Sequence, residues 1–101
     1  METAIRNTIL KQILWDYNIS VEDIEAVLQG EKKQAGHYNQ EMIFLKILES
    51  YPWYTILQLF SPLQIKYLLT NQVIKKLKSP SLRRKYGFVQ QRLQQLIPTA
   101  G

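Results

Sequence analysis

Signals for the start of a helix recur along this chain at intervals that leave room only for short helices. Ser61-Pro62 and Ser79-Pro80 each place a serine where it can cap a helix and a proline where it fits the first turn. Ser20 precedes two acidic residues at the spacing of a capping box. The alternating pattern of strands and the Asn-Gly or Asp-Gly turns of hairpins are missing. The sequence therefore predicts an all-α fold.

Apolar residues that recur every three or four positions predict the extents of these helices. The predicted helices cover residues 4–16, 21–29, 40–50, 52–60, 62–69 and 80–97, with a further helical turn at 72–77. The pattern leaves open whether that turn continues the preceding helix or begins a new one. Asn39 can cap the helix that follows it, and residues 31–37 form the only clear loop. We expect a compact orthogonal bundle of five to six short helices.

Two of the predicted helices are apolar around most of their circumference. In 40–50, only a narrow strip of Met42, Lys46 and Glu49 lies outside the apolar surface. In 52–60, only two residues are polar. Helices of this kind are contacted on several sides. We therefore expect both to be mostly buried and to lie at the centre of the bundle.

The last predicted helix, 80–97, is amphipathic. Its single apolar stripe consists of Leu82, Tyr86, Val89, Leu93 and Leu96. A projection of about 100° per residue places Arg83 and Arg84 outside this stripe. The same outer face holds four glutamines: Gln90, Gln91, Gln94 and Gln95. Phe88 also lies away from the stripe, so either a neighbouring helix covers it or it is left for a partner; Trp15, at the edge of the first helix, raises the same question.

Length and composition indicate one domain. The 101 residues predict a single helical domain over 1–97 with a frayed tail at 98–101. The absence of cysteine excludes disulfides and thiolate zinc sites. The first residues lack the features of a secretory signal, and two charged residues and a proline interrupt the most apolar stretch, 42–60. We expect a soluble, cytoplasmic protein with no membrane association.

Charge is distributed unevenly along the chain. Residues 1–49 hold eight acids and five bases, a net charge of −3, whereas residues 50–101 hold eight bases and no acid, a net charge of +8. Such an asymmetry is typical of a chain that meets a polyanion or an acidic partner. A compact fold could instead lay the two halves against each other and cancel much of the field.

The residues needed for familiar catalytic chemistry are missing. The chain has one histidine, no cysteine and no Gly-rich phosphate loop. His37 lies in the predicted loop, where a solvated histidine is expected. Glu22, Asp23 and Glu25 fall in the first turns of a short helix, where the helix dipole accounts for them. We predict no enzymatic activity, no cofactor, no metal site and no small-molecule substrate.

Positive charge is concentrated around the start of the last helix, where six bases fall within residues 75–85. Lysines can contact phosphates there, and arginine and glutamine can pair with guanine and adenine edges. Solvated helix faces are also rich in arginine and glutamine, which leaves a purely structural interpretation open. The candidate residues for binding a partner or nucleic acid are Lys75, Lys76, Lys78, Arg83, Arg84, Lys85, Phe88 and Arg92.

A helix-turn-helix around residues 53–69 is a further alternative, since two short helices meet near Ser61. Against it, the turn lacks glycine, and the second helix offers only Gln64, Lys66 and Tyr67 as groove contacts.

Four short segments occur in an order that spans residues 13–96. They are Leu14-Trp15-Asp16-Tyr17, Ile47-Leu48-Glu49 before Trp53, Ile65-Lys66-Tyr67-Leu68-Leu69, and Lys76-Leu77 leading into Ser79-Pro80-Ser81-Leu82. In these segments the chain resembles a family of short, uncharacterised bacterial helical proteins, often encoded beside nucleotidyltransferase-like toxins of the abortive-infection type and regarded as candidate antitoxins. The chain differs from that pattern by an extra stretch, 21–37. The resemblance implies a toxin-neutralising or partner-binding role and assigns no residue.

The sequence thus predicts a small bacterial binding protein. The first interpretation is a protein-interaction module whose basic last helix binds a protein partner or a second copy of the chain. An antitoxin is one form that such a module can take. The alternative is DNA or RNA binding by the same surface, dominated by phosphate contacts. A purely structural subunit is the third. Bases gathered on one exposed face would favour nucleic acid, whereas bases interleaved with exposed Phe88 and Trp15 would favour a protein partner or homodimer.

Overall fold

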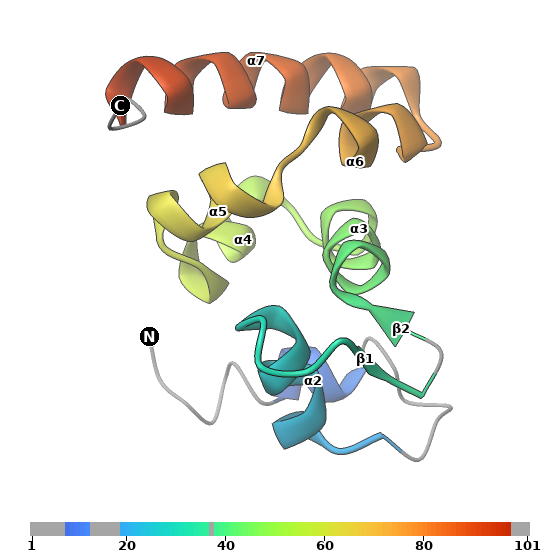
Figure 1. Ribbon diagram of the computed structural model, residues 1–101. Coiled ribbons are helices and arrows are strands. Elements are labelled where there is room, and N and C mark those ends of the chain that lie inside the picture. The colour runs from blue at the N-terminus through green and yellow to red at the C-terminus, as the bar shows by residue number, and fades with distance from the viewer. Residues whose placement is uncertain (1–7, 13–18, 37, 98–101) are drawn as a thin grey trace. The chain divides into compact units, whose positions relative to one another are not determined.

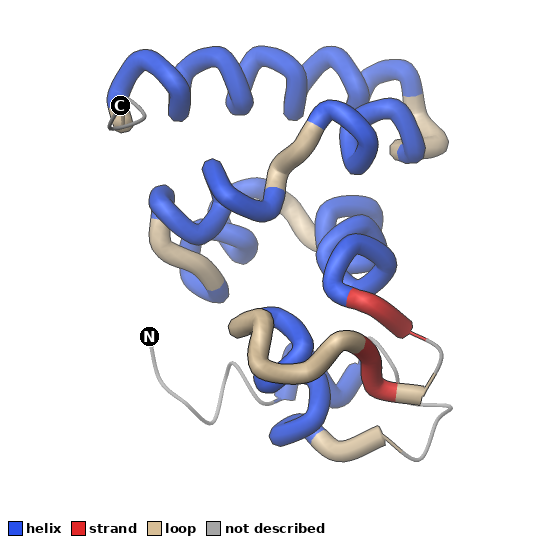
Figure 2. Tube along the Cα trace, in the orientation of Figure 1, coloured by secondary structure: helices blue, strands red, loops and turns tan. Residues whose placement is uncertain are grey.

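The computed structural model describes residues 8–12, 19–36 and 38–97, which are mostly helical (Figure 1). The described residues also include a small two-stranded sheet (Figure 2). The chain divides into two compact units, Met1–Leu59 and Phe60–Gly101, and each is described by itself. The mostly helical class is confirmed, whereas the single domain and the orthogonal arrangement stay predictions.

The first complete helix, α2 (Val21–Leu28), begins at the predicted cap. The Ser20 hydroxyl accepts a hydrogen bond from the backbone N–H of Asp23 at 3.1 Å. This bond satisfies one of the N–H groups that the first turn of a helix leaves without a partner. After the helix ends, Gly30 has a φ of +82°, a left-handed conformation that glycine adopts without steric cost.

A short β-hairpin follows α2 and corrects the prediction that residues 31–37 form only a loop. Strands β1 (Gln34–Ala35) and β2 (Tyr38–Asn39) pair antiparallel. Gly36 has a φ of +60°, and a Cβ there would lie 3.1 Å from the Ile19 side chain. The strands were missed because two residues are too few to show an alternating pattern.

Helix α3 (Gln40–Ser50) begins at Asn39, as predicted. The Asn39 side chain accepts a hydrogen bond from the N–H of Met42 at 2.9 Å. The Gln40 amide donates to the carbonyl of Leu28 at 3.1 Å, which ties the start of α3 to the end of α2. Four of the eleven residues of α3 are fully buried, and its place at the centre of a bundle stays a prediction.

Helix α4 (Trp53–Leu59) is less buried than its composition predicts. Ile56 and Leu59 are buried, but Tyr54 is 70% exposed and Leu57 43% exposed. A helix buries only the face that meets a neighbour, and in this unit α4 packs against α3. The prediction that the whole helix is mostly buried is therefore wrong.

The core of the first unit also takes in a helical stretch at 8–12; the rest of the predicted first helix lies outside the described residues. The buried apolar side chains of this unit are Leu10, Ile24, Val27, Leu28, Ala35, Tyr38, Ile43, Phe44, Ile47, Leu48, Ile56 and Leu59.

The second unit begins with α5 (Pro62–Leu68), which starts at the predicted serine and has a full capping box. The Ser61 hydroxyl accepts from the N–H of Gln64, and the Gln64 side chain accepts from the N–H of Ser61. These reciprocal bonds fix the start of the helix at Pro62.

The turn left open by the sequence is a separate helix, α6 (Asn71–Lys76). Thr70 has extended backbone, with φ −87° and ψ 166°, and its hydroxyl accepts a hydrogen bond from the N–H of Val73 at 3.2 Å. Helix α5 thus ends at Leu68, and Thr70 caps a new helix.

Helix α7 (Pro80–Leu96) starts at Ser79, whose hydroxyl accepts from the N–H of Leu82. Of the predicted apolar stripe, Tyr86 and Leu93 are buried and two further members are half-buried. Leu96 is 68% exposed, so the apolar stripe is not covered along its whole length. Leu96 lies in the last turn of α7.

Helices α5 and α6 both pack against α7. The buried apolar residues of this unit are Phe60, Ile65, Leu68, Leu69, Val73, Leu77, Tyr86 and Leu93. Within the described ranges, no helix is long and apolar enough to cross a membrane. The predicted tail at 98–101 lies outside them.

Candidate interaction surface

The division into two units coincides with the division of charge. All eight acids of the chain belong to Met1–Leu59, whereas Phe60–Gly101 has eight bases and no acid. The side chains of the second unit therefore carry a formal charge of +8. Its surface is attractive to anionic partners over distances set by the ionic strength.

Arg83 binds backbone carbonyls within this unit. Its Nη1 donates to the carbonyl of Leu77 at 2.5 Å and to that of Lys78 at 3.3 Å. Leu77 is the C-cap of α6, so the guanidinium satisfies a carbonyl at the end of that helix and closes the turn into α7. The expected outward orientation of Arg83 is corrected: it is half-buried and acts within the fold.

Lys66, half-buried on α5, also binds a backbone carbonyl. Its ammonium donates to the carbonyl of Ile97, the C-cap of α7. A cation at the C-terminal end of a helix also interacts favourably with the helix dipole. Lys66 therefore holds α5 against the end of α7, which removes it from the groove contacts considered for a helix-turn-helix.

The six remaining bases of the unit are exposed. Lys75 and Lys76 lie in the last turn of α6, where the dipole favours them, and the Nζ of Lys85 lies 5.4 Å from the centre of the Tyr86 ring. Burial raises the pKa of Tyr86 to about 12, so its phenol stays protonated at neutral pH. The exposed bases are Lys75, Lys76, Lys78, Arg84, Lys85 and Arg92.

Four exposed residues of α7 follow one another at intervals of four: Arg84, Phe88, Arg92 and Leu96. Residues at this spacing form a continuous ridge along a helix. Phe88 is 63% exposed and Leu96 68% exposed, so the ridge alternates arginine with an exposed apolar side chain. We call these four residues the Arg84–Leu96 ridge. Its exposure answers the question left open about Phe88, whereas Trp15 lies outside the described residues.

The glutamines of α7 do not all share this outer face. Gln90 donates through Nε2 to the carbonyl of Leu69 at 3.0 Å and so belongs to the packing of α7, which corrects its predicted position. Gln91, Gln94 and Gln95 are exposed, and Gln95 accepts a hydrogen bond from Arg92 at 3.4 Å. The exposed glutamines give the ridge a polar margin.

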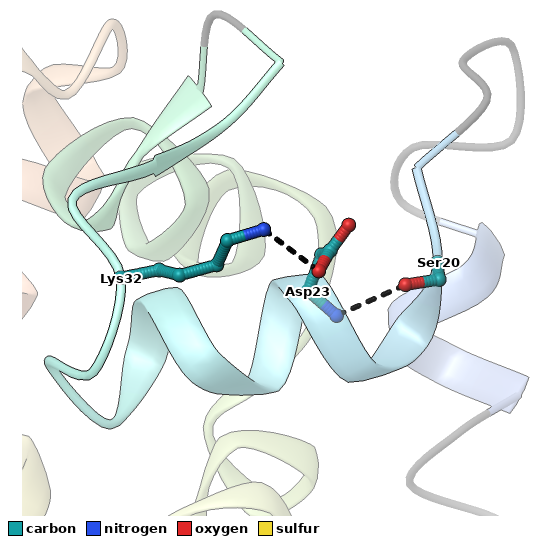
Figure 3. Close-up of polar contacts among 3 residues, drawn as sticks. All are labelled: Ser20, Asp23 and Lys32. Carbon is teal, nitrogen blue, oxygen red and sulfur yellow. Dashed lines mark hydrogen bonds and ion pairs between the residues drawn. The ribbon is translucent and has the colours of Figure 1, made fainter.

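The acidic residues near the start of α2 do not form a metal site. The Asp23 carboxylate pairs with the Lys32 ammonium at 2.9 Å, and its backbone N–H binds Ser20 (Figure 3). The Lys32 hydrogen bond and positive charge lower the pKa of Asp23. Among the residues that the structure describes, no group of three or more His, Cys, Asp or Glu side chains could hold a metal ion. His37 lies outside them.

The fold and this surface define a mostly helical protein with a basic helix face that carries exposed apolar side chains. Comparisons with protein-family models, curated proteins and solved structures find no match. The antitoxin resemblance therefore stays a prediction, and the function is argued from the surface itself.

Two features of the surface were missed in the sequence. Leu96 was assigned to the apolar stripe, and only its place in the last turn of the helix signals its exposure. Leu63 and Tyr67, one turn apart on α5, are 62% and 77% exposed. Nothing in their apolar character distinguishes them from core residues.

Proposed function

We propose that this chain is a protein-interaction module that binds an acidic protein partner through the Arg84–Leu96 ridge. The observation that carries the proposal is the exposure of Phe88 between Arg84 and Arg92, each one helical turn away. Aromatic and arginine side chains are the types enriched at the energetic centres of protein interfaces.

The exposure of Phe88 and Leu96 argues against the interpretation that this face of α7 is only solvated. Solvation accounts for the arginines and glutamines of α7, which are good helix formers on a surface. It gives no reason for two large apolar side chains on the same exposed row. Covering an exposed phenylalanine or leucine contributes about 1.5–3 kcal/mol, which a partner can use as binding free energy.

The charge of the unit indicates the kind of partner. With eight bases and no acid in Phe60–Gly101, an acidic surface is attracted and a basic one repelled. In this proposal the chain acts in the cytoplasm by binding, without catalysis, cofactor, metal or small-molecule substrate. An antitoxin that neutralises a toxin-like protein is one form of this activity, supported by the resemblance of the sequence.

Nucleic-acid binding is the second candidate function, favoured by the exposed bases of α6 and α7. Phosphates could contact Arg84 and Arg92, and a single unstacked base could stack on Phe88. Leu96, however, continues the same row, and a charged phosphate backbone offers no apolar surface to cover its side chain. The alternation of charged and apolar residues therefore favours a protein partner.

Fluorescence anisotropy can test the proposal with three labelled probes: an acidic glutamate–leucine copolymer of about 20 residues, a duplex DNA and a single-stranded RNA of about 20 nucleotides, each at about 50 and 200 mM salt. We expect the copolymer to bind most tightly. The double variant Arg84→Gln/Arg92→Gln should weaken its binding by at least about tenfold.

A matched control removes the same charge elsewhere. Lys11 and Lys33 are exposed residues of the first unit, so Lys11→Gln/Lys33→Gln lowers the net charge equally without touching α7. We expect it to weaken binding by less than about twofold. Tighter binding of DNA or RNA than of the copolymer, or equal losses in the two double variants, would contradict the proposal.

A further inference from the structure

We infer that the partner segment bound by the Arg84–Leu96 ridge is an acidic amphipathic helix that packs across α7. This inference rests on the proposed function and adds the secondary structure and chemistry of the partner. It follows from the spacing of the ridge, its alternation of side-chain types and the nature of a helix surface.

The spacing fits helix-on-helix packing. The ridge runs from Arg84 to Leu96, about 18 Å along the axis at about 1.5 Å per residue. Rows of residues four apart are the ridges that fit into the grooves of a second helix, typically at a crossing angle of about −50°. The side of α7 that holds Tyr86 and Leu93 is buried within the unit, and on the exposed side the ridge is the row that carries the large apolar side chains, Phe88 and Leu96.

The alternation of side chains defines the complementary surface. Phe88 and Leu96 are eight residues apart, about 12 Å along the helix, with Arg92 between them. A partner helix matches this row when its apolar residues cover Phe88 and Leu96 and its carboxylates lie beside Arg84 and Arg92. Arginine can bind such carboxylates in a bidentate manner, which adds orientation to the attraction of charge.

An extended acidic peptide would find no backbone hydrogen bonds on this surface. Extended peptides gain much of their affinity from backbone hydrogen bonds to an exposed strand edge. The backbone N–H groups in the middle of α7 are used within the helix, so this surface offers side chains alone. A helical partner makes its backbone hydrogen bonds within its own helix, so it needs none from this surface.

Among the described residues, the helix with the most acidic side chains, α2, does not supply the required helix in a second copy of this chain. Its acidic helix, α2, has only eight residues, about 12 Å, which is shorter than the ridge. The large apolar residues Ile24, Val27 and Leu28 of α2 are buried in its own unit. Glu22 is exposed, but no large apolar side chain of α2 accompanies it to cover Phe88. We therefore assign the surface to a different protein.

Two designed peptides test the inference directly. Both have about 18 residues on an alanine-rich background, which favours the helix, and both contain the same leucines and glutamates. In the amphipathic peptide, leucines eight residues apart alternate with glutamates one turn away on the same face; in the permuted peptide, these residues are spread around the helix. Anisotropy of each labelled peptide gives its affinity for the full-length protein.

We expect the amphipathic peptide to bind at least about tenfold more tightly than the permuted one. Phe88→Ala should weaken its binding by at least about tenfold. Tyr67→Ala is the matched control, because Tyr67 is an exposed aromatic on α5 of the same unit, and it should change binding by less than about twofold. Far-UV circular dichroism shows whether each variant keeps its helical content.

The remaining outcomes separate the inference from the proposed function. Equal binding of the two peptides, with a loss only in Arg84→Gln/Arg92→Gln, would overturn the helical partner and leave acidic protein binding standing. Equal losses in Phe88→Ala and Tyr67→Ala would also overturn it. Binding of single-stranded RNA with no binding of either peptide would overturn both.

Discussion

Neighbouring side chains on α7 have different tasks, and Arg83 and Arg84 show this most clearly. The guanidinium of Arg83 is held by the carbonyls of Leu77 and Lys78, whereas Arg84 is exposed on the ridge. Successive residues of a helix point about 100° apart, so only one of the two can reach the end of α6. A run of bases in a sequence can therefore combine a structural residue with a binding residue.

Substitution of Arg83 tests this difference. Arg83→Ala leaves the Leu77 carbonyl without its donor, so we expect the free energy of unfolding to fall by about 1–3 kcal/mol. Arg84→Ala is the matched control, and we expect a change within about 0.5 kcal/mol. Urea unfolding followed by circular dichroism measures both. Equal stabilities of the two variants would show that Arg83 does not hold the turn.

Tyr86 gives the fold a defined response to alkaline pH. Its pKa is raised by burial from 10.0 to about 12 in the folded protein. Below pH 10 the phenol is protonated in both states, but between pH 10 and 12 only the unfolded state releases the proton. Tyr86 thus stabilises the fold below pH 10, and this contribution is lost as pH rises through 12.

Unfolding experiments across this range can isolate the Tyr86 contribution. We expect the wild-type protein to lose about 2 kcal/mol between pH 10 and 12 relative to Tyr86→Phe, which has no phenol to ionise. The comparison cancels the titration of lysines, which both proteins share. Parallel pH profiles for the two proteins would contradict the assigned pKa.

At the scale of elements, caps and turns decide where each helix begins. The side chains of Ser61 and Thr70 accept hydrogen bonds within the first turns of α5 and α6, so local sequence was sufficient to predict where α5 begins and to mark a break near Thr70. It was insufficient for the hairpin at Gln34–Asn39, because two-residue strands have no periodicity and depend on their pairing.

Gly87 is expected to destabilise α7. It lies in the interior of the helix, and a Cβ added there meets nothing within 4 Å. Gly87→Ala should therefore raise the free energy of unfolding by about 1 kcal/mol, since alanine loses less backbone entropy in a helix. Thermal unfolding measures this change. A lower melting temperature would show that close packing at Gly87 was overlooked.

For the whole molecule, burial was harder to predict than secondary structure. Tyr54, Leu63 and Tyr67 have the same apolar character as core residues, yet they are exposed. Which face of an apolar helix is covered depends on its neighbours, and helical spacing contains no information about them. The basic candidate segment was identifiable from the sequence alone, but the ridge within it required the exposed fractions of Phe88 and Leu96.

The uneven charge of the molecule supports the same account of function. The first unit carries −3 and the second +8, so attraction of an acidic partner is concentrated on the unit that contains α7. Exposed charges act over about 10 Å at 0.1 M salt. The electrostatic part of binding should therefore weaken with salt, whereas the contribution of Phe88 and Leu96 should remain.

The central claim is that the Arg84–Leu96 ridge is the binding surface, and NMR chemical-shift mapping tests it most directly. Uniformly ¹⁵N-labelled protein would be titrated with the unlabelled glutamate–leucine copolymer. We predict that the largest backbone shifts fall on Arg84, Phe88, Arg92, Leu96 and the residues beside them on α7. Largest shifts on α4 or α5, around Tyr54 or Tyr67, with α7 unchanged, would contradict the account.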